Sequence, residues 1–252
     1  MSTSWKVYVV NLARSSERWL RIHNHLDLLQ LDHERVDAVD AQEFVSIPAD
    51  YLVDKNKQCF FSPLKSSEIA CYMSHISALK QFLSNQDVAY AVILEDDVEF
   101  IQQPNAVIES IINQMDSSGA VKLYNKRDEL CFGREQLPDG FRTVTPVRVP
   151  LGFQAQLWSR AAAQEFIAQC KYFYRPIDVD MQYKWQFDFP LTLVQPNLVR
   201  ELSAEVGGST ISPVKSRISW NKIQLEFNRP FFRLKILYFS IVDSFMHGIR
   251  QR

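Results

Sequence analysis

The stretch YAVILEDD at residues 90–97 decides the fold of this sequence, because it joins a short apolar run to three adjacent acids. A run such as Tyr90–Leu94, rich in β-branched and aromatic residues, is typical of a buried strand. Glu95, Asp96 and Asp97 follow it directly. In open α/β sheets, ligands bind outside the carboxyl ends of the strands. The stretch therefore predicts a binding site at one edge of a largely parallel sheet.

The N-terminal segment predicts a strand–helix–strand unit that belongs to the same sheet. Residues 5–12 form a second apolar run, and residues 33–41 read as a strand that leads into a loop. Between them, Ser15 or Ser16 begins a helix whose apolar residues recur every three or four positions. Such a start is typical of an α/β fold with a mostly parallel central sheet.

The rest of the chain predicts alternating helices, strands and loops without an internal repeat. We expect, in chain order, an irregular insertion over 44–64, a helix over 68–84 that Ser66 or Ser67 caps, a helix over 104–115, strands and loops over 120–150, a helix over 159–170 and a loop-rich stretch over 174–213.

The composition favours a soluble globular protein with a substantial core. The chain has 252 residues, of which 46% are hydrophobic and 23% charged. A net charge of −1 does not indicate a nucleic-acid partner. The four cysteines form no CxxC pair, which argues against a zinc site. We see no signal peptide and no apolar run of the about 20 residues that a spanning helix needs, so we expect a cytoplasmic protein.

The acids at 95–97 have three interpretations. Adjacent carboxylates at a sheet edge repel one another, and a divalent cation such as Mg²⁺ or Mn²⁺ would relieve the repulsion and bind substrate phosphates. The acids are equally compatible with a solvated turn, or with a phosphotransferase that uses a strand-end Asp as nucleophile. Since neighbouring strand residues point to opposite faces, Glu95 and Asp97 share a face only if the strand continues to residue 97.

Three segments, in this order and spacing, resemble the glycosyltransferases of family 25. They are VVNLARSSER at 9–18, EIACYMSH at 68–75 and VILEDDV at 92–98, with fainter similarity at 36–40, 157–160, 176–178 and 209–211. Ala70 departs from the family's usual Gly, and Gln156 from an expected aromatic residue. The second departure leaves the acceptor open.

The resemblance implies a GT-A-like fold, a nucleotide-sugar donor and a divalent metal. It makes Asp97 the first metal ligand and catalytic residue, with Glu95 as second ligand and Asp96 in support. Residues that would bind the donor are Asn11, Arg14, Arg18, Asp37, Ser74, His75, Glu95 and Asp96. For His75 the alternative is a buried hydrogen bond that fixes the acidic strand end, for Arg18 a solvated helix residue, and for Asp37 a turn-stabilising role.

An inverting transfer needs a carboxylate that acts as base on the acceptor hydroxyl. Asp178 and Asp180 lie in the downstream half of the chain, where acceptors usually dock. Asp178 matches the family position and is our candidate, although either residue could instead cap the following segment.

The C-terminal tail differs in composition from the rest of the chain. Residues 215–252 carry a net charge of +6, which leaves −7 on the remainder, and residues 231–249 mix cations with large apolar side chains. We expect a helical basic extension over 214–252, after a transferase domain over 1–213. It would lie on an anionic membrane surface; the alternatives are a helix packed on the domain and a dimer interface.

The resemblance to family 25 implies a hexosyltransferase that moves galactose or glucose from a UDP-sugar onto a bacterial lipooligosaccharide or lipopolysaccharide acceptor. It would be metal-dependent, inverting and peripheral on the inner face of the cytoplasmic membrane. The alternative is a non-catalytic nucleotide- or sugar-binding protein with a degenerate transferase fold. The sequence leaves the donor sugar, the linkage and the oligomeric state open, a homodimer included.

Overall fold

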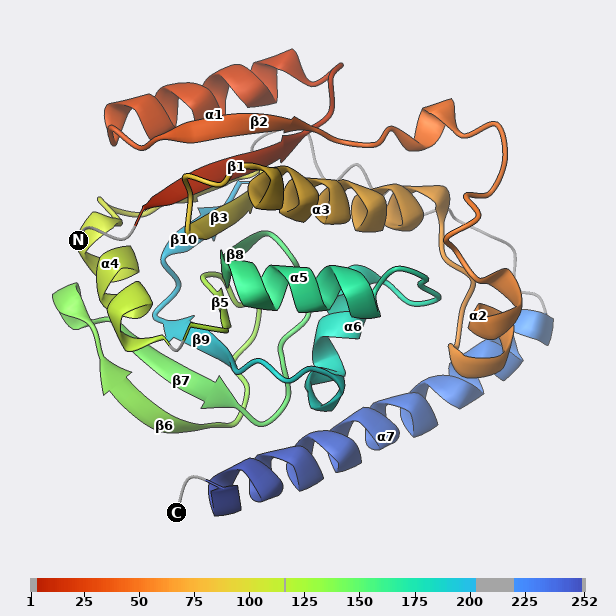
Figure 1. The fold of residues 1–252 in the computed structure, drawn as a ribbon. Coiled ribbons are helices and arrows are strands. Elements are labelled where there is room, and N and C mark those ends of the chain that lie inside the picture. The colour runs from red at the N-terminus through yellow and green to blue at the C-terminus, as the bar shows by residue number, and fades with distance from the viewer. Residues whose placement is uncertain (1–3, 116, 203–219, 251–252) are drawn as a thin grey trace.

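The computed structural model describes residues 4–115, 117–202 and 220–250, which fold around one eight-stranded sheet with the strand order β2-β1-β3-β8-β5-β9-β7-β6 (Figure 1). The pairings make six strands point in one direction and only β8 and β7 in the other. The mostly parallel sheet predicted from the sequence is therefore confirmed. The strands are β1 (Trp5–Asn11), β2 (His33–Asp37), β3 (Tyr90–Glu95), β5 (Ala120–Lys122), β6 (Cys131–Gln136), β7 (Arg142–Pro146), β8 (Ala155–Ser159) and β9 (Leu191–Gln195), with β4 (Val98–Phe100) and β10 (Val199–Glu201) in a separate antiparallel pair.

Helices cover both faces of the sheet, as the alternation of buried side chains requires. In β1, Val7 and Val9 pack with one layer while Tyr8 and Val10 pack with the other. The first layer holds α1 (Ser16–Leu28) and α4 (Asn105–Gln114); the second holds α3 (Ser66–Ser84), α5 (Arg160–Gln169) and α6 (Ile177–Gln182).

The three strands β2, β1 and β3 lie side by side and parallel, so their carboxyl ends form one edge. Asn11 pairs in register with Asp37, and Val10 with Glu95. The predicted strand–helix–strand start is confirmed as β1-α1-β2. The helices predicted over 104–115 and 159–170 are confirmed as α4 and α5, each one residue shorter at both ends. This is the α/β architecture expected of a GT-A-like domain.

Three local predictions were wrong. The insertion over 44–64 contains the helix α2 (Val53–Cys59), and the stretch predicted as loop-rich contains α6, β9 and β10. α3 is capped at Lys65 rather than at Ser66 or Ser67, because Glu68 accepts a hydrogen bond from the Lys65 backbone N–H and so fixes the start of the helix.

Residues 220–250 of the predicted C-terminal extension form one long helix, α7 (Trp220–Arg250), which lies along the outside of the sheet layers (Figure 1). Ile236 and Ser240 are buried against the rest of the protein, and Phe232 packs on Phe60 and Phe61. Among the described residues, no helix is both long and apolar enough to cross a bilayer. The predicted division of the chain after residue 213, and the similarity at 209–211, lie outside the described residues.

Candidate functional site

The acidic motif lies where the parallel strands end. β3 stops at Glu95, and Asp96 and Asp97 form the turn that leads into β4. The strand does not continue to residue 97, so the condition under which Glu95 and Asp97 would share a strand face is not met. Each of the three carboxylates instead has its own surroundings.

Asp96 is held by Asn11 at the end of β1 and by two arginines of α1. Its Oδ2 accepts from Asn11 Nδ2 at 2.7 Å and its Oδ1 from Arg18 Nη1 at 3.1 Å. Arg21 Nη2 donates to the Asp96 carbonyl at 2.5 Å. Asn11 and Arg18, predicted to bind the donor, therefore contact the motif itself. The sequence analysis missed Arg21, although its position three residues after Arg18 puts both side chains on one helix face.

Glu95 is held by α3 on the opposite side. His75 Nε2 donates to Glu95 Oε1 at 3.1 Å, and the imidazole is 1% exposed with its edge against Phe153. His75 therefore makes the buried hydrogen bond to the acidic strand end that the sequence analysis gave as its alternative role. Its neighbour Ser74 accepts from the Val39 N–H and donates to the Ala70 carbonyl, so this hydroxyl ties the loop after β2 to α3.

Asp97 is buried and incompletely hydrogen-bonded. Its side-chain Oδ1 has no hydrogen-bond partner among the described residues, while its backbone carbonyl accepts from the Leu202 N–H at 2.7 Å. Burial, then the charges of Glu95 and Asp96, raise its pKa to about 7, against the opposing effect of Arg18. A buried, repelled carboxylate with an unpartnered oxygen is the environment that a divalent cation would stabilise, so these residues fit a metal ion.

Asp178 reaches the same region from α6. Its Oδ2 accepts from the Gly152 N–H at 3.0 Å, in a turn where Gly152 has φ +99°, a conformation that favours glycine. Asp178 and Glu95 both act electrostatically on the buried ammonium of Lys122. The structure therefore brings the candidate base near the acidic motif.

Lys122 is the main residue that the sequence analysis missed. It is 1% exposed at the end of β5, and its Nζ donates to the Pro150 carbonyl at 2.6 Å and the Gly152 carbonyl at 2.5 Å. Burial lowers its pKa to about 8, although Asp178 and Glu95 act in the opposite direction. No local sequence signal marks this lysine, because only the sheet order places it beside the loop over 150–152.

Asp180, the other candidate base, belongs to the core. It pairs with Arg175 Nε at 2.6 Å and accepts from the Tyr72 hydroxyl at 2.7 Å. Arg175 and Asp180 are both about 5% exposed. These contacts give Asp180 a structural role and leave Asp178 as the carboxylate of this segment that lies near the motif.

The remaining predicted residues lie at the exposed rim. Arg14 Nε contacts Asp40 Oδ2 at 2.5 Å, and this ion pair lowers the pKa of Asp40. Asp37 is exposed at the end of β2, with Arg35 Nε 3.5 Å from its Oδ1. Neither contact brings Arg14 or Asp37 to the buried carboxylates.

An open hollow of about 620 Å³ lies on the side of β4 and β10, and none of the three acids of the motif lines it. Its lining includes Tyr124 and Glu201, which share a hydrogen bond of 2.9 Å. Glu201 immediately precedes Leu202, whose N–H binds Asp97, and its charge helps to raise the pKa of Asp97. Within the part of the chain that the structure describes, the hollow therefore connects to Asp97 only through Glu201 and its neighbour Leu202.

The family model described as "Glycosyltransferase family 25 (LPS biosynthesis protein)" matches residues 4–137, more than half of the chain. The chain therefore belongs to glycosyltransferase family 25.

The individual relatives of known name share less than a third of their residues with this chain over the matched region. The procollagen galactosyltransferase 1-A of Xenopus laevis is 28% identical over 38% of this chain and 16% of its own length. A Bos taurus protein named "Probable inactive glycosyltransferase 25 family member 3" is 26% identical over 65% of this chain and 28% of its own. The chain thus spans well under a third of either relative.

Among solved structures, a Drosophila β1,4-galactosyltransferase 7 mutant in complex with manganese, UDP-Gal and xylobiose is similar to this chain. The TM-score is 0.45 at 10% identity, over 88% of this chain and 79% of that one.

Proposed function

We propose that this protein transfers a hexose, galactose or glucose, from a UDP-sugar to a sugar of a lipopolysaccharide or lipooligosaccharide acceptor, with inversion and with a divalent metal. The observation that carries the proposal is the buried Asp97 carboxylate, crowded by Glu95 and Asp96 and with one oxygen unpartnered. The description of the family model as an LPS biosynthesis protein supports the acceptor class. The name of the Xenopus relative supports galactose.

Asp97 and Glu95 would hold a Mn²⁺ or Mg²⁺ ion, which would supply positive charge to the departing diphosphate. Asn11 and Arg18 then act by fixing Asp96, which in turn holds the turn that carries Asp97. His75 has the matching role on the other side, since it fixes the orientation of Glu95. Arg14, in the turn after β1, and Asp37, at the end of β2, are both exposed, and they would meet the outer parts of the donor.

Asp178 would act as the base on the acceptor. One oxygen is fixed by the Gly152 N–H, which leaves Oδ1 to take the proton of the attacking hydroxyl. As the acceptor oxygen bonds to the anomeric carbon, the bond from that carbon to the nucleoside diphosphate breaks, which inverts the configuration in one displacement.

The second candidate is a non-catalytic protein that binds a nucleotide or a sugar. The Bos taurus relative named as inactive supports this alternative. Against it stands the cost of a buried Asp97 carboxylate that Glu95 and Asp96 repel, since a protein without a ligand there would gain stability from a neutral side chain.

We also propose that α7 places the enzyme on the inner face of the cytoplasmic membrane, next to its lipid-linked acceptor. The outward face of α7 carries an apolar stripe at helical spacing, with the exposed cations Arg233 and Lys235 beside it. The residues of this stripe are Phe231, Leu234, Tyr238, Ile241 and Phe245. Cations next to exposed apolar side chains favour an anionic lipid surface over a neutral one.

The test is a calorimetric screen of UDP-, GDP-, CMP- and dTDP-sugars with and without Mn²⁺, on the wild type and on Asp97→Asn. We expect one UDP-hexose to bind with Mn²⁺, and the variant to lose the metal-dependent part. Transfer to a lipooligosaccharide acceptor by the wild type then separates the two candidates. Nucleotide binding without transfer would favour the non-catalytic protein, and binding that ignores both Mn²⁺ and Asp97 would refute the metal assignment.

A further inference from the structure

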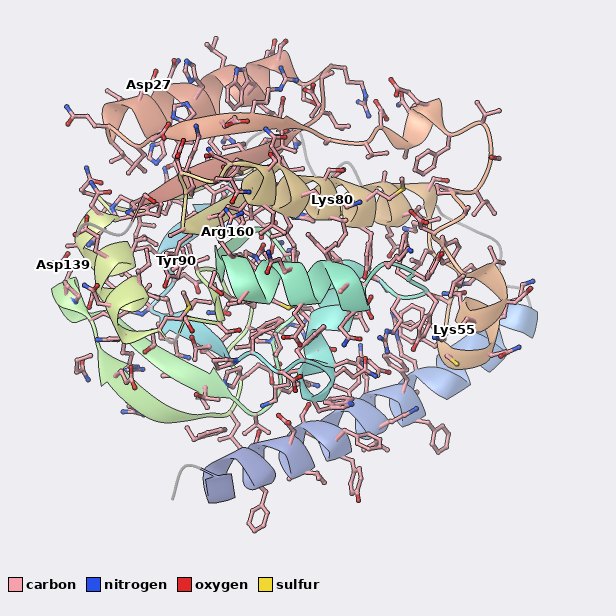
Figure 2. The ribbon with its side chains drawn as sticks, in the orientation of Figure 1. Asp27, Lys55, Lys80, Tyr90, Asp139 and Arg160 are labelled. Carbon is pink, nitrogen blue, oxygen red and sulfur yellow. The ribbon has the colours of Figure 1, made fainter. Side chains whose placement is uncertain are left out.

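Two histidines and an aspartate meet at the far end of α1, away from the acidic motif. His23 and Asp27 lie one turn apart on α1, and His33 begins β2. His23 Nδ1 lies 2.7 Å from His33 Nε2, and Asp27 oxygens lie 3.4 Å from His23 Nε2 and 3.9 Å from His33 Nε2. Figure 2 labels Asp27 on α1, at the outer edge of the molecule.

In the neutral form of the cluster, two hydrogen-bond acceptors face the ring of His23. The Leu31 carbonyl lies 2.8 Å from His33 Nδ1, and since a carbonyl only accepts, Nδ1 carries the hydrogen. His33 Nε2 then presents a lone pair towards His23. The Asp27 carboxylate is a second acceptor facing the same ring, so a neutral His23, with one N–H, satisfies only one of the two.

A cation bound between the three side chains would satisfy these acceptors; without one, His23 must carry a hydrogen on both nitrogens to do so. The three residues offer ligand atoms that all lie within 4.8 Å of one another. Zinc bonds of about 2.0–2.1 Å to nitrogen and oxygen put tetrahedral ligands about 3.3 Å apart, so ligand atoms within 4.8 Å need only small side-chain rotations to share one ion, with His23 binding through one of its two nitrogens. A backbone carbonyl that accepts from the far nitrogen of a ligating histidine, as Leu31 does for His33, is the usual support of such a ligand.

We propose that His23, Asp27 and His33 form a binding site for a divalent transition-metal ion of the zinc class. The imidazole ligands select such ions over Mg²⁺ and Ca²⁺, which prefer oxygen. The wide cysteine spacing argued against a zinc site in the sequence; this site uses no cysteine, and the turn from α1 into β2 assembles it. Asp27 is 58% exposed and His23 38%, so the site is open to ions from solution.

The ion would fasten the end of α1 to the start of β2. Trp19, one turn before His23, stacks on its ring at 5.3 Å, so the cluster is packed against the helix. The same helix carries Arg18 and Arg21, both bound to Asp96 of the acidic motif. A metal ion bound there would therefore stabilise α1, the helix that holds the acidic motif, although the ion itself would not contact the donor.

The test is titration of the full chain with Zn²⁺ in excess Mg²⁺, followed by calorimetry and by NMR of the imidazole nitrogens. To remove a competing thiol site near Cys71, His75 and Glu95, the titration uses the Cys71→Ser variant. We expect one Zn²⁺ per chain, shifts in the nitrogen signals of His23 and His33, and a rise in Tm. His33→Gln and Asp27→Asn should each weaken Zn²⁺ binding at least tenfold, while Asp32→Asn, an acid in the same turn, should not.

Equal Zn²⁺ affinity in His33→Gln and its parent, or unchanged signals of His23 and His33, would overturn the proposal. Donor binding distinguishes this outcome from a failure of the proposed function. Asp27→Asn should keep the Mn²⁺-dependent binding of the UDP-sugar, and Asp97→Asn should keep the Zn²⁺ site.

Discussion

Arg18 Nη1 and Asp96 Oδ1 lie 3.1 Å apart, an ion pair that joins α1 to the turn after β3. Both side chains are mostly buried, at 16% and 12% exposed. Removal of one partner leaves the other charge partly desolvated, which costs more than the pair contributes when intact. The pair therefore ties the position of the acidic motif to the packing of α1.

We expect Arg18→Met to lower the free energy of unfolding by about 1–3 kcal/mol, because Asp96 then lacks its charged partner. Urea denaturation measures this change. Arg14→Met is the matched control, since Arg14 pairs with Asp40 at the exposed rim, and it should change stability much less than Arg18→Met does. Equal losses in the two variants would contradict a special role for the Arg18–Asp96 pair.

Asp97→Asn should stabilise the protein above neutral pH. The folded-state pKa of Asp97, about 7, is higher than the unfolded value of 3.8, so the folded state binds more protons between these pH values and stability falls as pH rises through them. A three-unit shift corresponds to at most about 4 kcal/mol. Relative to the wild type, the free energy of unfolding of the variant should rise by a large part of this amount at pH 8 and should not rise below pH 3.8.

Thermal unfolding of wild type and Asp97→Asn across pH 4–8, without divalent ions, checks this prediction. Mn²⁺ should reverse the order at pH 8, because the ion stabilises only the wild-type carboxylate. If the two unfolding curves stay parallel at all pH values, Asp97 does not titrate as inferred.

Asp178 and Asp180 offer a matched pair of substitutions. Asp178→Asn should lower kcat at least 100-fold at saturating donor and change Tm little, because its side chain meets one backbone N–H. Asp180→Asn should instead lower stability by about 3–5 kcal/mol, because it leaves the Arg175 charge buried and unpaired. Steady-state kinetics and calorimetric melting distinguish the two; an Asp178→Asn enzyme with normal kcat would remove Asp178 as the base.

The sequence was enough to predict which sheet edge carries the site, but not which residues contact one another there. The apolar runs over residues 5–12 and 90–94 predicted parallel strands with a site at their carboxyl ends, since local pattern determines strand position. The sequence could not show that Arg18 binds Asp96, nor that Lys122 lies beside Gly152. Those contacts join segments distant in the chain, and only the strand order and the direction of β8 bring them together.

Lys122→Met should reduce transfer at least tenfold while UDP-sugar affinity changes much less. Its ammonium holds the carbonyls of Pro150 and Gly152, and the Gly152 N–H fixes Asp178, so loss of the ammonium misplaces the base rather than the donor site. Single-turnover rates and donor calorimetry measure the two effects separately. Lys57→Met, at an exposed ion pair on α2, is the control and should have neither effect.

The apolar stripe on the outward face of α7 should bind lipid, because its aromatic and aliphatic side chains face away from the core. Leu234→Ser with Phe245→Ser should lower co-sedimentation with anionic vesicles at least fivefold, since both side chains are at least 60% exposed and their burial in lipid would be lost. Activity on a soluble acceptor should stay the same.

Leu28→Ser is the control for general surface hydrophobicity, since Leu28 is 84% exposed on α1, and it should leave vesicle binding unchanged. Vesicles without anionic lipid should bind the wild type weakly, because Arg233 and Lys235 then lack their counter-charge. A wild-type protein that ignores both kinds of vesicle, yet becomes monomeric in the double variant, would assign the stripe to contact with a second copy of the chain instead.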